Sequence, residues 1–84
     1  MYEILLARQA ERDLRRLPAE IFHRIVRQMR ELAQFPRPHG CRKLKDSGND
    51  YRIRVGDYRI LYEIDDGNRQ IRILRVGHRS DVYR

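Results

Sequence analysis

The segment from Tyr51 to Ile64, YRIRVGDYRILYEI, most strongly limits what this chain can fold into. Hydrophobic and charged side chains alternate on both sides of Gly56-Asp57, and alternation with a period of two is typical of strands that bury one face. Glycine at the first position of a two-residue loop suits a type II′ hairpin turn. The segment therefore predicts a β-hairpin, with these opposed pairs: Val55 and Tyr58, Arg54 and Arg59, and Ile53 and Ile60.

The same register gathers arginines on the face opposite the isoleucines. Arg52 and Arg54 on the first strand and Arg59 on the second point the same way. Like charges directly across a strand pair are destabilising, by some tenths of a kcal/mol up to about 1 kcal/mol, unless an anion neutralises them. The alternation alone leaves two interpretations open: a sheet face that binds a polyanion, and a solvated basic surface on a basic protein.

Length and charge narrow the function classes. With 84 residues the chain is expected to form one domain, residues 1–84, around a single small core. It carries 19 Lys and Arg against 12 Asp and Glu, a net charge of +7, and only Lys43 and Lys45 are lysines. Arginine favours planar, bidentate contact with phosphate. The composition indicates nucleic acid or an acidic protein as partner, and argues against a membrane surface.

The cysteine count and the N-terminus indicate a cytoplasmic protein. Cys41 is the single cysteine, so an intrachain disulfide is excluded, which fits a reducing compartment. The N-terminus lacks the charged region, apolar run and small-residue cleavage site of a signal peptide. No metal site is expected, because His23 has no second ligand at a suitable spacing and His39, in a loop, is expected to be inert.

The first half of the chain predicts a strand and two helices. Tyr2–Leu6 is short and apolar, as expected of an edge or second-edge strand. Arg8–Leu17 and Pro18–Gln34 carry apolar residues at helical spacing, and Pro18 is expected at the first position of the second helix. Pro36 ends that helix. The two helices should form an αα-hairpin that covers one face of a sheet.

The second half predicts the rest of the sheet. Residues 37–50 form a basic loop with a short strand near Arg42–Lys45. Asp66-Gly67 as a two-residue turn places Tyr62 opposite Ile71, Ile60 opposite Ile73, and Arg72 across from Leu61. The last strand then runs from about Gln70 to Val76, and Tyr58–Ile64 is central. Residues 77–84 are expected to fold back along the sheet, because Val82 and Tyr83 are costly to leave in water.

Together these elements predict an α+β fold in the order β-α-α-β-β-β, with the N-terminal strand and the αα-hairpin packed on one face of a small, mainly antiparallel, twisted sheet. In this setting the motifs RKLK, YRIRVGDYRILYEI and ILRVGHRSDVY resemble those of the RelE/ParE superfamily of toxins from type II toxin–antitoxin systems, most closely the RelE branch. The resemblance covers Tyr2 to Tyr83.

That resemblance implies a RelE-like fold and a metal-independent, cofactor-free endoribonuclease. Such toxins cleave mRNA, usually in the ribosomal A site, by attack of the 2′-hydroxyl on the phosphodiester. It further implies a cognate antitoxin that neutralises the toxin, and operator DNA bound by the toxin–antitoxin complex. The family's functional positions fall on Arg52, Arg54, Arg59, Arg79 and Tyr83. As residues that contact RNA we predict Lys43, Lys45 and Arg72.

The chain departs from the RelE pattern where lysines are expected on the first strand of the hairpin. Arg52 and Arg54 stand there, and a guanidinium does not deprotonate to serve as a base. Histidine is the side-chain type best suited to exchange protons near neutral pH, so His78 is the best candidate for the general base, with Asp81 and a tyrosinate at Tyr83 as alternatives. A ParE-like inhibitor of DNA gyrase and a catalytically inactive module that binds antitoxin and operator are the competing functions.

Overall fold

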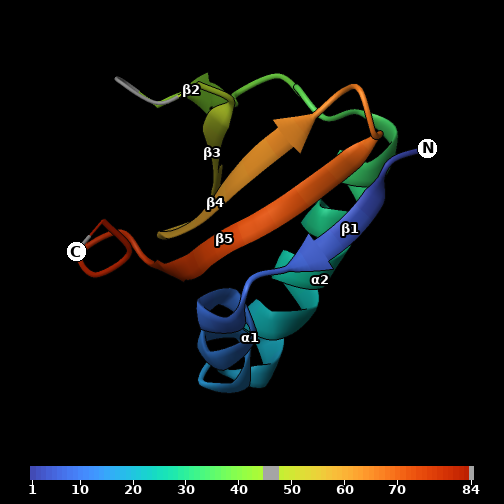
Figure 1. Ribbon diagram of the computed structural model, residues 1–84. Coiled ribbons are helices and arrows are strands. Elements are labelled where there is room, and N and C mark those ends of the chain that lie inside the picture. Colours follow the sequence, from blue (N-terminus) through green and yellow to red (C-terminus); the bar gives the residue numbers. More distant parts are fainter. Residues whose placement is uncertain (45–47, 84) are drawn as a thin grey trace.

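The protein is a five-stranded sheet covered by two helices on one face (Figure 1). The computed structural model describes residues 1–44 and 48–83. The sheet order is β1-β5-β4-β3-β2, antiparallel throughout except that β1 runs parallel to β5. This confirms the predicted α+β fold, with β1 at an edge and β4 in the centre. The elements are β1 (Glu3–Leu6), α1 (Arg8–Arg15), α2 (Ala19–Gln34), β2 (Arg42–Lys43), β3 (Asp50–Val55), β4 (Tyr58–Asp65) and β5 (Gln70–His78).

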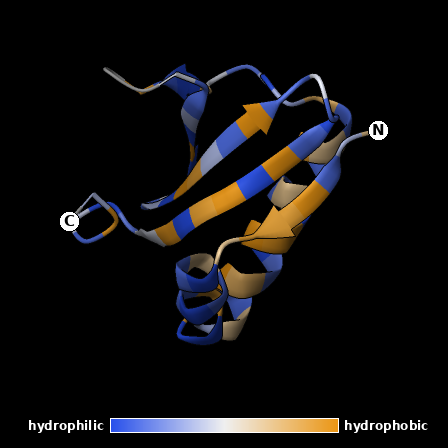
Figure 2. Cartoon of the chain, viewed as in Figure 1, coloured by the Kyte–Doolittle hydropathy of each residue, from blue (hydrophilic) through white to orange (hydrophobic). Residues whose placement is uncertain are grey.

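The core lies between the helices and the face of the sheet that carries the isoleucines, and apolar residues run along β4 and β5 in Figure 2. Tyr62 at its centre is fully buried, and its hydroxyl donates to the Pro36 carbonyl oxygen at 2.8 Å. Burial first, then the neighbouring Cys41, raises the pKa of Tyr62. The core residues from helices and sheet are Ala10, Leu14, Ile25, Leu32, Ile53, Val55, Ile60, Tyr62, Ile64, Ile71, Ile73 and Val76.

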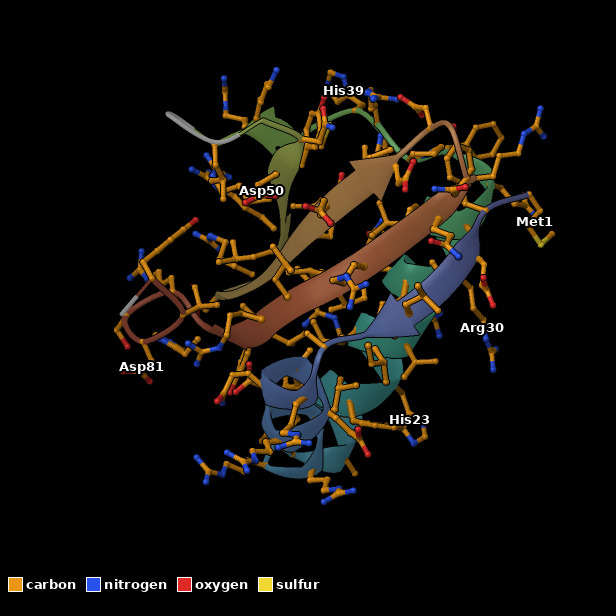
Figure 3. The ribbon with its side chains drawn as sticks, in the orientation of Figure 1. Met1, His23, Arg30, His39, Asp50 and Asp81 are labelled. Atoms are coloured by element: carbon orange, nitrogen blue, oxygen red, sulfur yellow. The ribbon has the colours of Figure 1, made fainter. Side chains whose placement is uncertain are left out.

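Both helices form where the apolar spacing predicts them. Pro18 lies one residue before the first turn of α2 rather than within it, with φ −57° and ψ 147°, and its carbonyl accepts the N–H of Phe22 at 2.8 Å. The predicted apolar stripe of α2 was wrong at Phe22, whose side chain is exposed. His23 and Arg30 project from α2 away from the sheet (Figure 3). Within the described residues, no helix is long and apolar enough to cross a membrane.

The first hairpin has the predicted register. Val55 pairs with Tyr58, Arg54 with Arg59 and Ile53 with Ile60. Gly56 has a φ of 60°, whereas Asp57 is not among the residues with positive φ. A turn with a left-handed first position and an ordinary second position is type II′, so the glycine is required there.

The predicted register of the second hairpin was wrong, by two residues at Tyr62 and by three at Ile60, which pairs with Val76. Tyr62 pairs with Ile73 rather than Ile71, and residues 66–69 form a four-residue connection. Asp66-Gly67 does not form the predicted two-residue turn, because the aspartate has other partners. Asp66 Oδ2 accepts from Arg37 Nη2 at 2.9 Å, and Asp66 Oδ1 accepts from the Tyr2 hydroxyl at 2.6 Å. Arg69 takes the left-handed position, with φ 53°.

A β-bulge in β5 changes which side chains face the helices. The pairing of β4 with β5 shifts between Leu61 and Tyr62, so that Leu61 lies opposite Arg75 and Tyr62 opposite Ile73. An extra residue in one strand reverses the alternation beyond it. Val76 consequently enters the core, Gly77 faces away from the helices, and His78 lies on the same side as Tyr58.

Candidate nucleic-acid interface

The face of the sheet opposite the helices carries arginines on adjacent strands. Arg52 and Arg54 alternate with buried Ile53 on β3, and Arg59 lies directly across from Arg54 on β4. We call this surface the open face and define it by Arg52, Arg54, Arg59, Leu61 and Gly77. The predicted gathering of three arginines is therefore real, and it follows from the period of the strands and the two-residue turn.

Arg59 is the most enclosed of these arginines, with 9% of its surface exposed. Its Nη1 donates to the carbonyl oxygens of Gly56 and Tyr58, at 3.0 Å each. Within the described residues no carboxylate pairs with it. A guanidinium has five N–H donors, so Nε and Nη2 keep theirs for a ligand. The turn thus fixes the position of this cation and leaves its charge uncompensated.

Arg52 carries the clearest sign of a missing ligand. Its Nη1 is buried and has no hydrogen-bond partner in the described part of the chain. A buried donor left unpaired costs about 1–3 kcal/mol, more when charged. Arg42 on β2 lies directly opposite Arg52, which adds a second like-charge pair to that of Arg54 with Arg59. An anion on this surface would relieve both pairs and satisfy the orphaned nitrogen.

The C-terminal tail folds back as predicted and reaches the open face. The N–H of Arg79 donates to the Asp57 carbonyl oxygen at 2.8 Å, which ties the tail to the hairpin turn. Val82 is 2% exposed, and its side chain lies 3.6 Å from where a Cβ on Gly77 would stand. Gly77 pairs with Arg59, so Val82 packs on the open face beside that arginine. Tyr83 follows it and is exposed.

His78 is on the other side of the sheet from the arginines. Its ring makes an edge contact with Tyr58, with the ring centroids 5.6 Å apart. The backbone N–H of Ser80 donates to Nδ1 at 3.1 Å, and the Ser80 hydroxyl lies 2.8 Å from the same nitrogen. A neutral imidazole that accepts at Nδ1 carries its proton on Nε2. A role as general base stays a prediction, and it requires His78 to give up this contact.

The residues predicted to contact RNA are dispersed. Lys43 is exposed on β2, and Lys45 lies outside the described residues. Arg72 is exposed, and its Nε lies 4.0 Å from Glu63 Oε1. The prediction that Arg72 lies across from Leu61 was wrong, since its partner is Glu63, so its charge is partly offset. Asp81, the alternative base, is exposed in the turn that follows β5 (Figure 3).

One guanidinium that sequence reasoning missed is neutralised within the fold. Arg75 Nε donates to Asp13 Oδ2 at 2.9 Å, and the same oxygen accepts the N–H of Val76 at 2.9 Å. Burial raises the pKa of Asp13, but hydrogen bonds from Arg75, Val76 and Gln9 outweigh it, and the net shift is downward. The spacing of Ile71, Ile73 and Val76, two residues and then three, was the available signal for the bulge next to Arg75.

Sequence reasoning also missed the arginines that flank the hairpin. Arg42 was predicted to lie in a short strand but was given no role in binding, and Arg24 on α2 reaches the turn, with Nη2 3.3 Å from where a Cβ on Gly56 would lie. The spacing of Arg24 and Arg27, one helical turn apart, was the available signal. Among the described residues, no group of three or more His, Cys, Asp or Glu side chains is placed to hold a metal ion.

Comparison with known proteins places this arrangement in a family. Residues 4–83 match the family described as the ParE toxin of the type II toxin–antitoxin system, parDE. Toxin RelG of Mycobacterium tuberculosis (strain ATCC 25618 / H37Rv) is 36% identical over 84 residues, covering 99% of this chain and 97% of that protein. Toxin RelE of the same organism is 34% identical, covering 99% of this chain and 87% of that protein.

Solved structures of toxin–antitoxin complexes have the same fold. The RelBE2 complex from Mycobacterium tuberculosis superposes with a TM-score of 0.82 at 33% identity, covering 92% of this chain and 96% of the matched chain. The archaeal RelE–RelB complex from Pyrococcus horikoshii OT3 gives a TM-score of 0.83 at 28% identity, covering 96% and 98%.

Proposed function

Since this chain belongs to the RelE/ParE superfamily of type II toxin–antitoxin toxins, we propose that it is an endoribonuclease that cleaves mRNA in the ribosomal A site. The observation that carries the proposal is the open face: Arg52, Arg54 and Arg59 lie together without a carboxylate partner among the described residues. A phosphodiester is the ligand that such a set of cations fits best.

The proposed chemistry is attack of a 2′-hydroxyl on the adjacent phosphorus. A base takes the proton of that hydroxyl, the bond from phosphorus to the 5′-oxygen breaks, and the leaving oxygen takes a proton from water, which gives a 2′,3′-cyclic phosphate and a free 5′-hydroxyl. Arg59 is held by two carbonyl oxygens, so it is oriented before the substrate binds. Fixed donors aimed at developing negative charge contribute about 2.7–4 kcal/mol each to lowering a barrier. We assign Arg54, Arg59 and Arg79 to the charge that grows on the phosphorane, and Arg52 to a non-bridging phosphate oxygen.

Tyr83 is proposed to hold the nucleotide beside the scissile bond. Its exposed ring stands next to buried Val82, which anchors the tail against the open face. An aromatic ring at such a position can stack on an unpaired base and orient the 2′-hydroxyl. As the general base, a tyrosinate at Tyr83 is better positioned than His78, because His78 lies on the opposite side of the sheet from the arginines.

The partners proposed follow from charge and from the relatives. The solved relatives named above are complexes with RelB antitoxins, so we propose a cognate antitoxin that neutralises this chain. A net charge of +7 suits mRNA and the ribosome in the cytoplasm, and operator DNA when the antitoxin is bound.

The test is to map the 5′ ends of cellular mRNA after expression of the wild-type chain and of Arg59→Ala and Tyr83→Ala. Arg12→Ala on α1 serves as a control that also removes one exposed cation. We expect in-frame cuts with the wild type and the control, and their loss in both open-face variants. Cuts that persist in Arg59→Ala would refute the assignment of the site.

Inhibition of DNA gyrase is the second candidate, because the matching family is described by its ParE toxin. That activity would need no scissile phosphate on the open face. DNA damage without RNA cuts in the same expression experiment would favour it over the nuclease.

A further inference from the structure

Two adjoining hollows lie between α2 and β3, beside the open face. One, of about 260 Å³, is lined by Val55 and Gly56 at the hairpin turn, and the other, of about 280 Å³, is lined by His39, which Figure 3 labels. Gln28 and Arg54 line both, so the two hollows adjoin. We call the two hollows together the α2–β3 groove; its cationic residues are Arg24, Arg27, Arg42, Arg52 and Arg54.

The groove is strongly and almost uniformly positive. Among the described residues, Glu31 supplies the one carboxylate that lines the groove with these five arginines, and none of the five forms an ion pair with another described residue. Arg24 and Arg27 are one helical turn apart and line the same hollow. A fold gains nothing from such a concentration of one charge, whereas a chain of phosphates matches it.

The second observation that points to a ligand is the orphaned nitrogen of Arg52. This residue lines the groove, and its Nη1 is the buried side-chain atom without a hydrogen-bond partner among the described residues. A buried charged donor needs an acceptor. Since the protein atoms described around it supply none, the acceptor is expected to come from a bound molecule.

We propose that the α2–β3 groove binds the sugar–phosphate backbone of the RNA strand that continues from the open face over the edge of β3. The inference rests on the proposed function, because Arg52 and Arg54 belong to both surfaces. It extends the RNA contact to Arg24, Arg27 and Arg42, outside the cleavage site. The groove would therefore make the affinity for RNA depend on the length of the strand, and it would not affect the rate of the chemical step.

An extended acidic peptide fits this edge less well. Val55 pairs with Tyr58 across the two-residue turn, so its peptide groups point to β4 and those of Arg54 point outward. β2 already covers Tyr51 and Arg52. Arg54 thus offers the peptide groups of one residue, which is too little for an added strand, while guanidinium groups need no free strand edge to hold phosphates.

The test compares RNA lengths with Arg24→Gln/Arg27→Gln. Fully 2′-O-methylated RNAs of 4 and 12 nucleotides lack the attacking hydroxyl and stay intact, and fluorescence anisotropy gives Kd across a salt series. Each phosphate contact to a single strand contributes about 0.7 to the slope of log K against log salt. We expect the double variant to lower the slope for the 12-mer by about 1.4 and to leave the 4-mer unchanged.

Arg8→Gln/Arg12→Gln, which removes the same charge from α1, should leave both slopes unchanged. Arg24→Lys/Arg27→Lys should restore the 12-mer slope. If the slope for the 12-mer is unchanged in Arg24→Gln/Arg27→Gln, the proposal that the groove binds RNA is refuted, even if binding to the ribosome or to an acidic protein weakens. If instead the slope falls but Arg59→Ala still cleaves RNA, the groove stands and the proposed nuclease function fails.

Discussion

Arg75 on β5 and Arg59 on β4 show two ways of holding a guanidinium in the same sheet. Arg75 Nε lies 2.9 Å from an oxygen of Asp13, which is 7% exposed. Among the described residues, Arg59 is held by the carbonyl oxygens of Gly56 and Tyr58 and by no carboxylate. A carboxylate cancels the charge it binds, whereas neutral carbonyl groups orient a cation and leave its charge in place. The ion pair of Arg75 with Asp13 stabilises the fold, whereas the carbonyl oxygens around Arg59 leave a cation that can bind an anionic ligand.

Arg59→Ala is the strongest test of this difference between a guanidinium that binds a ligand and one that stabilises the fold. We expect the rate of RNA cleavage to fall about 10²–10³-fold, the usual cost of removing one preorganised donor. The melting temperature should change little, because the loss of two hydrogen bonds to carbonyl oxygens is offset by the loss of repulsion with Arg54, and no described carboxylate loses a partner. Cleavage assays on ribosome-bound mRNA and thermal unfolding measure the two effects. A large drop in melting temperature would make Arg59 a structural residue like Arg75.

The reverse outcome is expected for Asp13→Ala. Removal of this carboxylate leaves Arg75 and the N–H of Val76 without their acceptor, and breaking a buried pair costs about 3 kcal/mol of unfolding free energy. Urea denaturation measures the loss, with the exposed Asp81→Ala as control for stability. Asp13→Ala/Arg75→Ala should recover part of the loss. A cost below about 1 kcal/mol would show that the pair contributes little.

The pair should also give stability a dependence on acid. The pKa of Asp13 is lowered in the fold, so its contribution is complete above the unfolded value of about 3.9 and is lost as the pH falls through the folded value. The wild type should exceed Asp13→Asn by about 1.5 kcal/mol at pH 7. That advantage should disappear in denaturation curves taken well below pH 4. An advantage that stays constant down to pH 2 would contradict the pairing.

A smaller effect is expected where the tail meets the open face. Val82→Ala removes buried methyl groups over Gly77, at about 1 kcal/mol of stability. Loss of this anchor displaces Tyr83, and cleavage should fall by up to about tenfold. Val26→Ala on α2, which is partly buried and far from the tail in sequence, should lose stability without this loss of cleavage. Equal rates of cleavage in Val82→Ala and Val26→Ala would show that the position of Tyr83 does not matter for cleavage.

Sequence reasoning succeeded where interactions are local. The strand faces of β3 and β4 follow from alternation, and Gly56 alone requires the turn that sets Arg54 against Arg59. Both helices follow from spacing and from the prolines that bound them. These features depend on residues a few positions apart, so they can be read without knowing what packs against them.

Sequence reasoning failed where distant residues compete for the same group. Asp66 was predicted to shape a two-residue turn, but Arg37 and Tyr2 bind its carboxylate, and the connection lengthens. The bulge in β5 then reverses the alternation, which turns His78 away from the arginines. Asp13 gave no sign of burial, because its partner lies 62 positions away.

The amino-acid sequence determined the order of strands and helices, the side of the hairpin on which the arginines stand, and a positive charge suited to nucleic acid. The tertiary structure alone decided which of those charges are cancelled and which stay open. Alternation and turn chemistry depend on residues a few positions apart, so they can be recognised in the sequence. Compensation of a charge depends on which distant carboxylate the completed fold brings within hydrogen-bonding distance.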